Sequence, residues 1–336
     1  MSLLDQVKGK KEIKPLTVLF YGVHGIGKTS FASGAEKPIF IGVEENHEFD
    51  VSRFPAVKSW TQLKDQLTSL MKEKHDYRTL VLDTIDGLEE IAQKEILSGK
   101  DAQKSMATAL GGYGKAYEKM ADMFIELRDN YIVKLRDAGM QIIILAHSEK
   151  SKFEDPMLAI NYDTYSTAIH KACKHIFQDW CQAILFSNYD LVRAENSSGK
   201  EYAESMDGKR VIYTEERPSH VGKNRFDLPY ELDFPKQGAW SIFKRMVWDF
   251  YKSTNAEIAK PVAPVVNEEK VAPIEIEDKK LKSEWERLRK KAEKFLEKIE
   301  DEDVVNMARK SLKMAEDKNN LVAFGMVVEK IEKAAK

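Results

Sequence analysis

Cysteine is scarce in this chain of 336 residues, which holds only Cys173 and Cys181. Their spacing matches neither the ligand pairs of a zinc knuckle nor the thiols of a redox motif. Both of these site types are therefore excluded. We expect two reduced thiols that lie within the hydrophobic core.

Long hydrophobic runs and an excess of charge are also absent. The longest apolar runs, such as 142–146, are far too short to span a bilayer, and no apolar stretch follows the lysines near the N-terminus. The 53 basic and 55 acidic side chains give 53 − 55 = −2, so no field of the whole protein attracts nucleic acid. We expect a cytoplasmic protein without a membrane partner, whose contacts with nucleic acid are local.

Apolar runs of strand length alternate with longer helix-like stretches up to about residue 190. Uniformly apolar strands are typical of sheets buried on both faces, and alternation with helices is typical of parallel sheets. The sequence therefore predicts an α/β fold with a mainly parallel sheet flanked by helices. The predicted strands are 16–21, 38–43, 79–82, 141–146 and 183–187.

Two features interrupt this alternation. Gly111, Gly112 and Gly114 predict a mobile loop or a break in the long helical stretch that precedes residue 141. Later, the strand-like segments 191–194 and 210–214 flank the turn-rich segment 196–208, which predicts a hairpin at one edge of the sheet.

Prolines and a new periodicity divide the C-terminal part from the core. Residues 253–278 include Pro261, Pro264 and Pro273 and lack a periodic apolar face, so they predict a linker between a core of residues 1–252 and a helical tail of residues 279–336. In the tail, apolar residues recur at helical spacing, and two more short helices are expected to follow. The periodic residues are Leu281, Trp285, Leu288, Ala292, Phe295 and Ile299.

The strongest chemical signal fits the pattern G-x-x-x-x-G-K-[ST] and follows the first predicted strand directly. Its residues are Gly22, Val23, His24, Gly25, Ile26, Gly27, Lys28 and Thr29, with Ser30 next in the chain. In this pattern, glycines let backbone N–H groups wrap phosphate closely, the lysine reaches the β- and γ-phosphates, and the threonine hydroxyl ligates Mg²⁺. The segment predicts a P-loop that binds ATP and Mg²⁺, with Lys28 as an exposed loop lysine.

A carboxylate is expected to complete the metal site. Asp83 follows the apolar residues 80–82, and an acidic residue at the carboxyl end of a buried strand faces the ligand crevice of an open α/β sheet. We assign Asp83, together with Thr29, to Mg²⁺.

Hydrolysis also needs a group that orients or deprotonates water. Glu44 and Glu45 follow the second predicted strand. Here the chain resembles the RecA-type recombinase core, in which a glutamate just after this strand activates the water. The resemblance implies that Glu44 is the base, with Glu45 and Asp86 as alternatives.

The fourth predicted strand ends in His147. In RecA-like ATPases, a polar residue at this strand end senses the γ-phosphate and passes its presence to a DNA-contacting loop, and it is commonly glutamine. The resemblance gives His147 this role, although histidine departs from the pattern. The following polar segment, 148–167, predicts a long loop in which Lys150 and Phe153 and their neighbours suit single-stranded nucleic acid.

A cationic stretch, ERPSHVGKNR, lies late in the core at residues 216–225. In RecA-type filaments, basic residues from a comparable position reach the γ-phosphate of the neighbouring subunit. By this resemblance, Lys223 and Arg225 are candidate fingers that act in trans.

Taken in order, GVHGIGKTS, FIGVEE, LVLDTID, GGYGKAYEKM, IILAHSEK and ERPSHVGKNRFDLP resemble the phage-encoded nucleotide-binding proteins with a RecA-like core. Some of these proteins are single-strand annealing recombinases. The resemblance covers roughly residues 14–250. It implies ATP-dependent binding and annealing of single-stranded DNA by a homo-oligomeric ring or filament, with a single-strand-binding protein as partner.

Two other classes of protein stay open. One is an AAA-type remodelling ATPase, although a proline-rich linker follows the core where a helical lid would be expected. The other is a non-hydrolysing nucleotide switch that acts through its helical tail.

Overall fold

The computed structural model describes residues 12–45, 50–102, 104–154, 161–195, 201–254, 257–258 and 275–296, with residues 305, 308–313, 327–328 and 331–332 farther along. The chain divides into two compact units, Met1–Val265 and Val266–Lys336. This boundary falls within the predicted linker 253–278, most of which lies outside the described residues.

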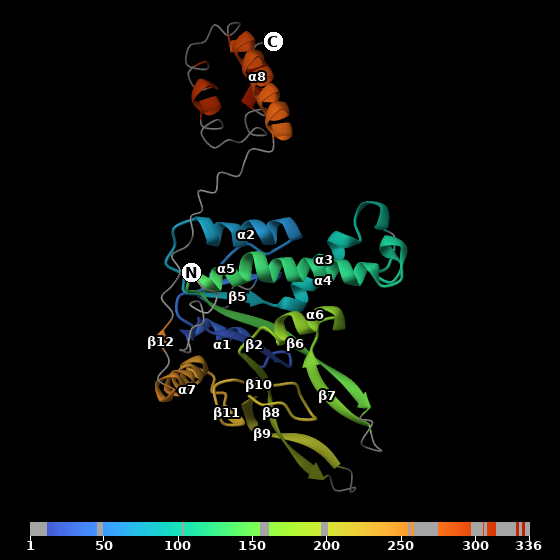
Figure 1. Cartoon of the computed structure of the whole chain (residues 1–336), viewed down its shortest axis with the longest axis vertical. Coiled ribbons are helices and arrows are strands. Elements are labelled where there is room, and N and C mark those ends of the chain that lie inside the picture. The colour runs from blue at the N-terminus through green and yellow to red at the C-terminus, as the bar shows by residue number, and fades with distance from the viewer. Residues whose placement is uncertain are drawn as a thin grey trace, which may run out of the picture. The chain divides into compact units, whose positions relative to one another are not determined.

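A mixed sheet forms the centre of the first unit (Figure 1). Its middle strands are parallel and follow the spatial order β3 (Pro38–Gly42), β5 (Thr79–Asp83), β6 (Gln141–Glu154), β2 (Thr17–Gly22) and β8 (Ala183–Glu195). These strands match the predicted ones, so the predicted α/β class with a mainly parallel sheet flanked by helices is confirmed. Because β6 lies between β2 and β5, the end of β6 is placed beside the P-loop strand.

Short strands extend the sheet at both edges. β4 (Ser52–Arg53) adds to β3 in parallel, whereas β9 (Glu201–Tyr213) and β11 (Glu231–Asp233) add antiparallel strands beyond β8. β10 (Lys223–Asn224) pairs with the first residues of β8. Apart from this sheet, β1 (Glu12–Ile13) pairs with β12 (Glu257–Ile258).

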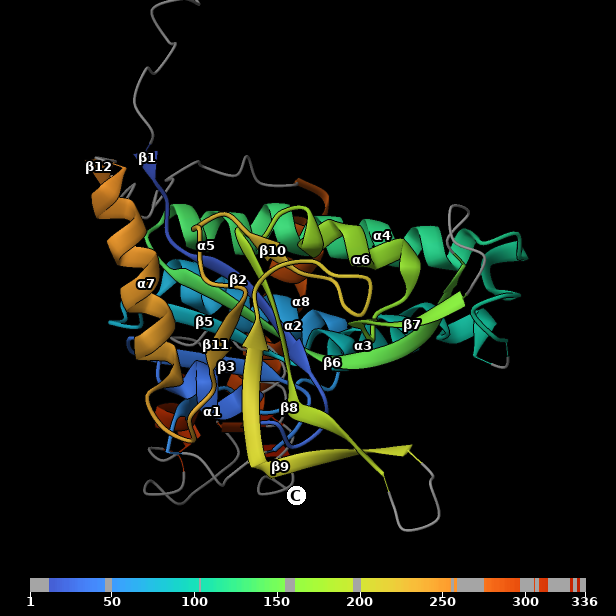
Figure 2. The same cartoon turned by 90° about the horizontal axis from the view of Figure 1, so that it is seen from below.

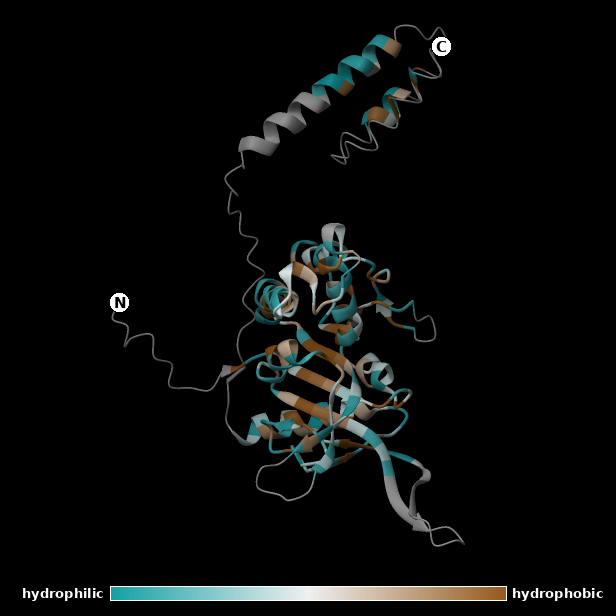
Figure 3. Ribbon diagram, turned by 90° about the vertical axis from the view of Figure 1, so that its right-hand side faces the viewer, coloured by the Kyte–Doolittle hydropathy of each residue, from teal (hydrophilic) through white to brown (hydrophobic). Residues whose placement is uncertain are grey.

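Alternate residues of each strand enter two separate cores. In β2, Val18 and Phe20 belong to one core and Leu19 and Tyr21 to the other, and all four are fully buried. This period of two is the geometry of a sheet covered on both faces, so both faces stabilise the fold by burial. Figure 3 shows the apolar strands enclosed between the helices.

Different helices cover the two faces (Figure 1). The core with Val18 packs against α1 (Lys28–Ser33) and α7 (Ala239–Ser253). The core with Leu19 packs against α2 (Trp60–Lys72), α3 (Ile85–Ile96), α4 (Lys115–Leu127), α5 (Val133–Asp137) and α6 (Lys171–Gln178).

The cysteines lie on the α6 side of this second core. Cys173 and Cys181 are buried and free, as predicted. Burial raises the pKa of each thiol to about 12, so both are inert at neutral pH.

The glycine-rich stretch breaks the helical region, as predicted. It lies between α3 and α4, after the 3₁₀ turns Gly99–Asp101 and Ala109–Gly111. From Leu110 to Gly114 every residue has a positive φ, between 53° and 91°. α4 then continues through a π-helical turn, Arg128–Ile132, into α5.

The loop predicted over residues 148–167 is wrong, because β6 continues to Glu154 and pairs antiparallel with β7 (Asn161–Thr167). Residues 148–167 were predicted as a loop because the segment is polar and has no apolar face. A two-stranded ladder can satisfy its backbone groups without one, and this part of β6 is mostly exposed. Residues 155–160 lie outside the described residues.

The hairpin predicted around residues 196–208 is confirmed but is longer than expected. β8 runs to Glu195 and pairs with β9, whose residues 201–208 were predicted as part of a turn. Residues 196–200 lie outside the described residues. Figure 2 shows both hairpins, β6–β7 and β8–β9, projecting from the sheet.

The second unit contains α8 (Glu275–Leu296), which begins three residues before the predicted end of the linker. Ala292, Leu296, Leu312, Val328 and Ile331 form its small core, which fits the predicted helical tail. Side-chain positions for Leu281 and Trp285, and residue Ile299, lie outside the described part. Among the helices that the structure describes, none has both the length and the apolarity that a membrane crossing requires.

Candidate nucleotide-binding site

The predicted P-loop connects β2 directly to α1. Gly25 and Gly27 have φ values of +70° and +105°, which side chains rarely tolerate, and Ile26 between them is fully buried and anchors the loop. This left-handed backbone turns successive N–H groups toward one point, as in other anion-binding nests. The loop therefore has the shape that its sequence predicts.

Lys28 is buried rather than exposed, with only 8% of its surface accessible. Its ammonium donates hydrogen bonds to the carbonyl oxygens of Gly22 and Val23, each at 3.2 Å. Burial lowers the pKa of Lys28, against the opposing attraction of Asp86 and Asp83 and a weaker one from Glu44. A buried ammonium held by its own loop is placed to meet an anion there.

Thr29 and Asp83 meet as predicted for a metal site. The Thr29 hydroxyl donates to Oδ2 of Asp83 at 3.2 Å. The same oxygen lies 3.3 Å from Nη2 of Arg53, a side chain from β4 that also lies over the ring of Phe40. Sequence analysis did not identify Arg53, because β4 comes close to Asp83 only through the order of the strands in the sheet.

This donor set fits Mg²⁺. A hydroxyl and a carboxylate are hard oxygen ligands, and Mg²⁺ commonly takes few protein ligands beside phosphate and water oxygens. Among the described residues, no cluster of three His, Cys, Asp or Glu side chains suited to a metal is present. The Thr29 and Asp83 oxygens are therefore the protein ligands that the structure offers at the loop.

The end of β6 is held by α3 and touches the P-loop. Thr84 caps α3 immediately after Asp83, which places Asp86 in the first turn. Asp86 accepts hydrogen bonds from the backbone N–H of His147 at 2.9 Å and from its ring Nδ1 at 2.7 Å. The His147 ring stacks on His24 of the P-loop, with centroids 4.1 Å apart. A change in the loop can therefore act directly on the strand end.

The candidate bases differ in their surroundings. Burial would raise the pKa of Asp86, but its hydrogen bonds with His147 hold that pKa below the ordinary value. Both of its oxygens are engaged, so Asp86 is poorly suited to accept a proton. Glu44 and Glu45 are exposed, and the charge of Glu44 acts on both Lys28 and His24. The geometry favours Glu44.

Comparison with known proteins places the chain in a family. Residues 14–226 match the AAA_24 family, described as an AAA domain. The chain belongs to this family. A KaiC-like protein from the hyperthermophilic archaeon Pyrococcus horikoshii OT3 is structurally similar, with 14% identity, a TM-score of 0.31, and coverage of 60% of this chain and 79% of that one. No curated protein matches the chain.

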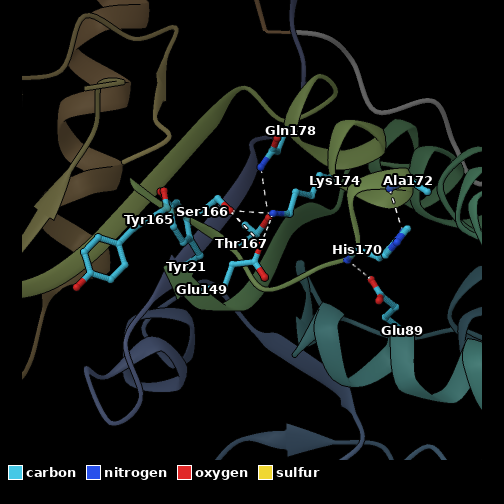
Figure 4. Close-up of polar contacts among 10 residues, drawn as sticks. All are labelled: Tyr21, Glu89, Glu149, Tyr165, Ser166, Thr167, His170, Ala172, Lys174 and Gln178. Atoms are coloured by element: carbon cyan, nitrogen blue, oxygen red, sulfur yellow. Dashed lines mark hydrogen bonds and ion pairs between the residues drawn. The ribbon is translucent and has the colours of Figure 1, made fainter. Parts of the chain in front are cut away.

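The β6–β7 hairpin of this AAA domain is fixed at its root, as Figure 4 shows. Lys174 of α6 pairs with Glu149 of β6 and donates to the hydroxyl of Ser166 of β7 at 2.8 Å. At the start of α6, the backbone N–H of His170 donates to Glu89 of α3 at 2.8 Å. Since α3 also carries Asp86, one helix holds both the strand end at the P-loop and the support of the hairpin.

The cationic stretch 216–225 is divided between two places. Its middle packs on the hairpin root, where Tyr165 exchanges backbone hydrogen bonds with Ser219 and Val221. Lys223 instead lies where β10 pairs with the first residues of β8, at the end of the sheet opposite the P-loop. Its ammonium donates to the carbonyls of Gln178 and Asp179 at 2.9 and 2.7 Å, and Arg225 nearby is exposed.

Within one chain, then, Lys223 and Arg225 are not part of the nucleotide site. Lys223 caps the C-terminus of α6, a position that favours a cation. Their role as fingers toward a neighbouring subunit stays a prediction. Among the described side chains, Arg53 contacts Asp83 and Arg210 contacts the P-loop from β9.

Proposed function

We propose that this protein is a phage recombination ATPase that binds single-stranded DNA and promotes annealing or strand pairing. It would act in the host cytoplasm as a homo-oligomeric ring or filament, beside a single-strand-binding protein. Membership of the AAA_24 family supports nucleotide binding and ATPase activity. The DNA role is supported by the resemblance of the six motifs and by the hairpin.

The observation that carries the proposal is the continuity of β6. The strand runs from His147, which contacts the P-loop, into an exposed arm that bears Lys152 and Phe153. Phe153 is 46% exposed and its ring lies 5.4 Å from that of Tyr162 on β7. Basic and aromatic side chains on one arm suit single-stranded DNA, because bases stack on rings while cations follow phosphates.

The nucleotide chemistry follows from the placed residues. Backbone N–H groups of the loop and Lys28 would hold the phosphates, and Glu44 would orient the attacking water and accept its proton. Thr29 and Asp83 would hold Mg²⁺, which would supply positive charge to the phosphates. His147 would respond to the phosphates through its contact with His24.

An ATPase assay with and without single-stranded DNA tests the proposal. We expect oligo(dT) to raise turnover, and the variant Lys152→Ala with Phe153→Ala to lose this stimulation while keeping basal turnover. Lys72→Ala, which removes an exposed lysine from α2, is the control for charge. Turnover stimulated only by another protein would favour a remodelling ATPase, and ATP binding without turnover would favour a switch.

A further inference from the structure

Arg210 of β9 contacts the P-loop through a backbone carbonyl group. Its Nη1 donates a hydrogen bond to the carbonyl oxygen of Ile26 at 2.7 Å. The guanidinium also lies over the ring of Phe234, 4.5 Å from the centroid, which holds its plane in place. Arg210 therefore joins the β8–β9 hairpin to the middle of the phosphate-binding loop.

The contact with Gly27 is equally close. A Cβ atom on Gly27 would lie 2.6 Å from Nη1 of Arg210 and 3.5 Å from the ring of Phe234. The φ of +105° favours glycine here, and a Cβ atom at this position would also displace the guanidinium of Arg210. The side chain of Arg210 therefore packs closely against the turn at Ile26 and Gly27.

The hydrogen bond acts on a peptide unit that has a second function. The carbonyl of Ile26 and the N–H of Gly27 belong to one peptide group, and the N–H groups of such a loop cradle phosphate. A cationic donor on the carbonyl polarises the peptide group and strengthens its N–H as a donor on the other side. The charge of Arg210 also adds to the positive field within the loop.

A second donor atom of Arg210, Nη2, indicates a role beyond packing against the loop. Its Nη2 is buried and has no hydrogen-bond partner among the described residues. Burying an unpaired guanidinium donor is unfavourable, so it offsets part of the stability that Arg210 gains from Ile26 and Phe234. An anion in the loop would offset that cost, because the guanidinium contacts the loop at Ile26.

We propose that Arg210 is a positioning residue for polyphosphate binding, which sets and polarises the Ile26–Gly27 peptide group of the P-loop. The inference rests on the proposed use of this loop for ATP. It concerns the phosphate end of the nucleotide, so it applies equally to ATP and to inorganic tripolyphosphate, which has no base or sugar.

The test compares Arg210→Gln, Arg210→Lys and Lys209→Gln in the full-length protein. Lys209 is the adjacent residue, with an exposed side chain that pairs with Asp190, so its variant removes the same charge away from the loop. Titration calorimetry measures the affinity for ATP and for tripolyphosphate, and chemical denaturation without ligand measures the stability of each variant.

We expect Arg210→Gln to weaken both ligands by the same factor, roughly tenfold, because the Ile26–Gly27 peptide group loses its polarisation and the loop loses a nearby positive charge. Arg210→Lys should recover part of this loss, because it keeps the charge but not the planar donor. Lys209→Gln should stay within about twofold of wild type. A purely structural arginine would lower stability in Arg210→Gln without changing either affinity.

Wild-type affinity for both ligands in a folded Arg210→Gln protein would overturn the inference. So would weaker binding of ATP alone, since that places Arg210 at the base or sugar. If Arg210→Gln does not fold, the Arg210→Lys variant provides the test. Affinities for ATP and tripolyphosphate that both fall by about threefold would support the inference, and unchanged affinities would refute it. Failure of the wild-type protein to bind ATP would instead refute the use of the loop for nucleotide.

Discussion

The two ends of the parallel strands carry cations in different ways. At the end with the P-loop, Lys28 is buried and donates to carbonyls of its own loop, and Arg210 donates to the carbonyl of Ile26. At the other end, Lys223 binds the last carbonyls of α6 and Arg225 is exposed. Similar residue types therefore serve a ligand site at one end and helix capping at the other. The local sequence does not show which of these roles a cation has, because the order of the strands decides at which end of the sheet the residue lies.

The largest effect is expected for Glu44→Gln at the P-loop end. The amide keeps the shape of the side chain but cannot accept a proton, so turnover should fall by about 10²- to 10⁴-fold while ATP affinity changes little. Single-turnover hydrolysis and nucleotide titration measure the two quantities. Glu45→Gln is the matched control, and a comparable loss in that variant or in Asp86→Asn would move the base to the other residue.

Lys28→Ala should weaken ATP binding by about ten- to a hundredfold, because a charged hydrogen bond to phosphate is worth about 1.5–3 kcal/mol. Its stability should change little, since burial already disfavours the charged form of this lysine. Fluorescent nucleotide titration and thermal unfolding provide the readouts. Lys37→Ala, which changes a lysine with a 55% exposed side chain, is the control. ATP affinity within a few-fold of wild type would refute the P-loop assignment.

At the opposite end, Lys223→Ala should lower the free energy of unfolding by about 1 kcal/mol, through loss of its two bonds to α6. Arg225→Ala should leave stability unchanged, because the side chain is exposed.

If Lys223 and Arg225 also act on a neighbouring subunit, the protein with both Lys223→Ala and Arg225→Ala should bind ATP normally but hydrolyse it slowly. Mixing this double variant with the Glu44→Gln protein should then restore activity. If the mixed proteins assemble together but regain no ATPase activity, the hypothesis that Lys223 and Arg225 act in trans is refuted.

The smallest effect concerns Glu89, the carboxylate of α3 that supports the hairpin. Burial raises its pKa above the ordinary value. The stability linked to its protonation is therefore complete below the unfolded pKa and is lost as pH rises through the higher folded pKa. Glu89→Gln keeps an acceptor for the N–H of His170, so it should be up to about 1 kcal/mol more stable at pH 7 and equal at pH 4.

Denaturation at the two pH values measures this difference. Glu90→Gln, at a neighbouring side chain that is 72% exposed, should show no such change with pH. An equal gain for Glu89→Gln at both pH values would mean that burial of the charge is not the cause.

The sheet and the P-loop were predictable because their signals are local. Strands buried on both faces must be uniformly apolar, as in 142–146, and a loop that wraps phosphate must have glycine where φ is positive. The β6–β7 hairpin was harder to predict, since the exposed half of β6 has no apolar face and only its pairing with β7 makes it a strand. Alternation of hydrophobicity cannot reveal a ladder that is solvated on both sides.

By itself, the sequence determined the α/β class, the phosphate loop at 22–30, and Asp83 and Glu44 at strand ends that must share one edge of a parallel sheet. Only the tertiary structure decided that Asp86 holds His147 rather than standing as a free base, that Lys223 caps α6, and that Arg53 and Arg210 reach the site. The physical reason is distance along the chain. Asp86 and His147, or Ile26 and Arg210, meet through strand order and sheet register, which no short segment encodes.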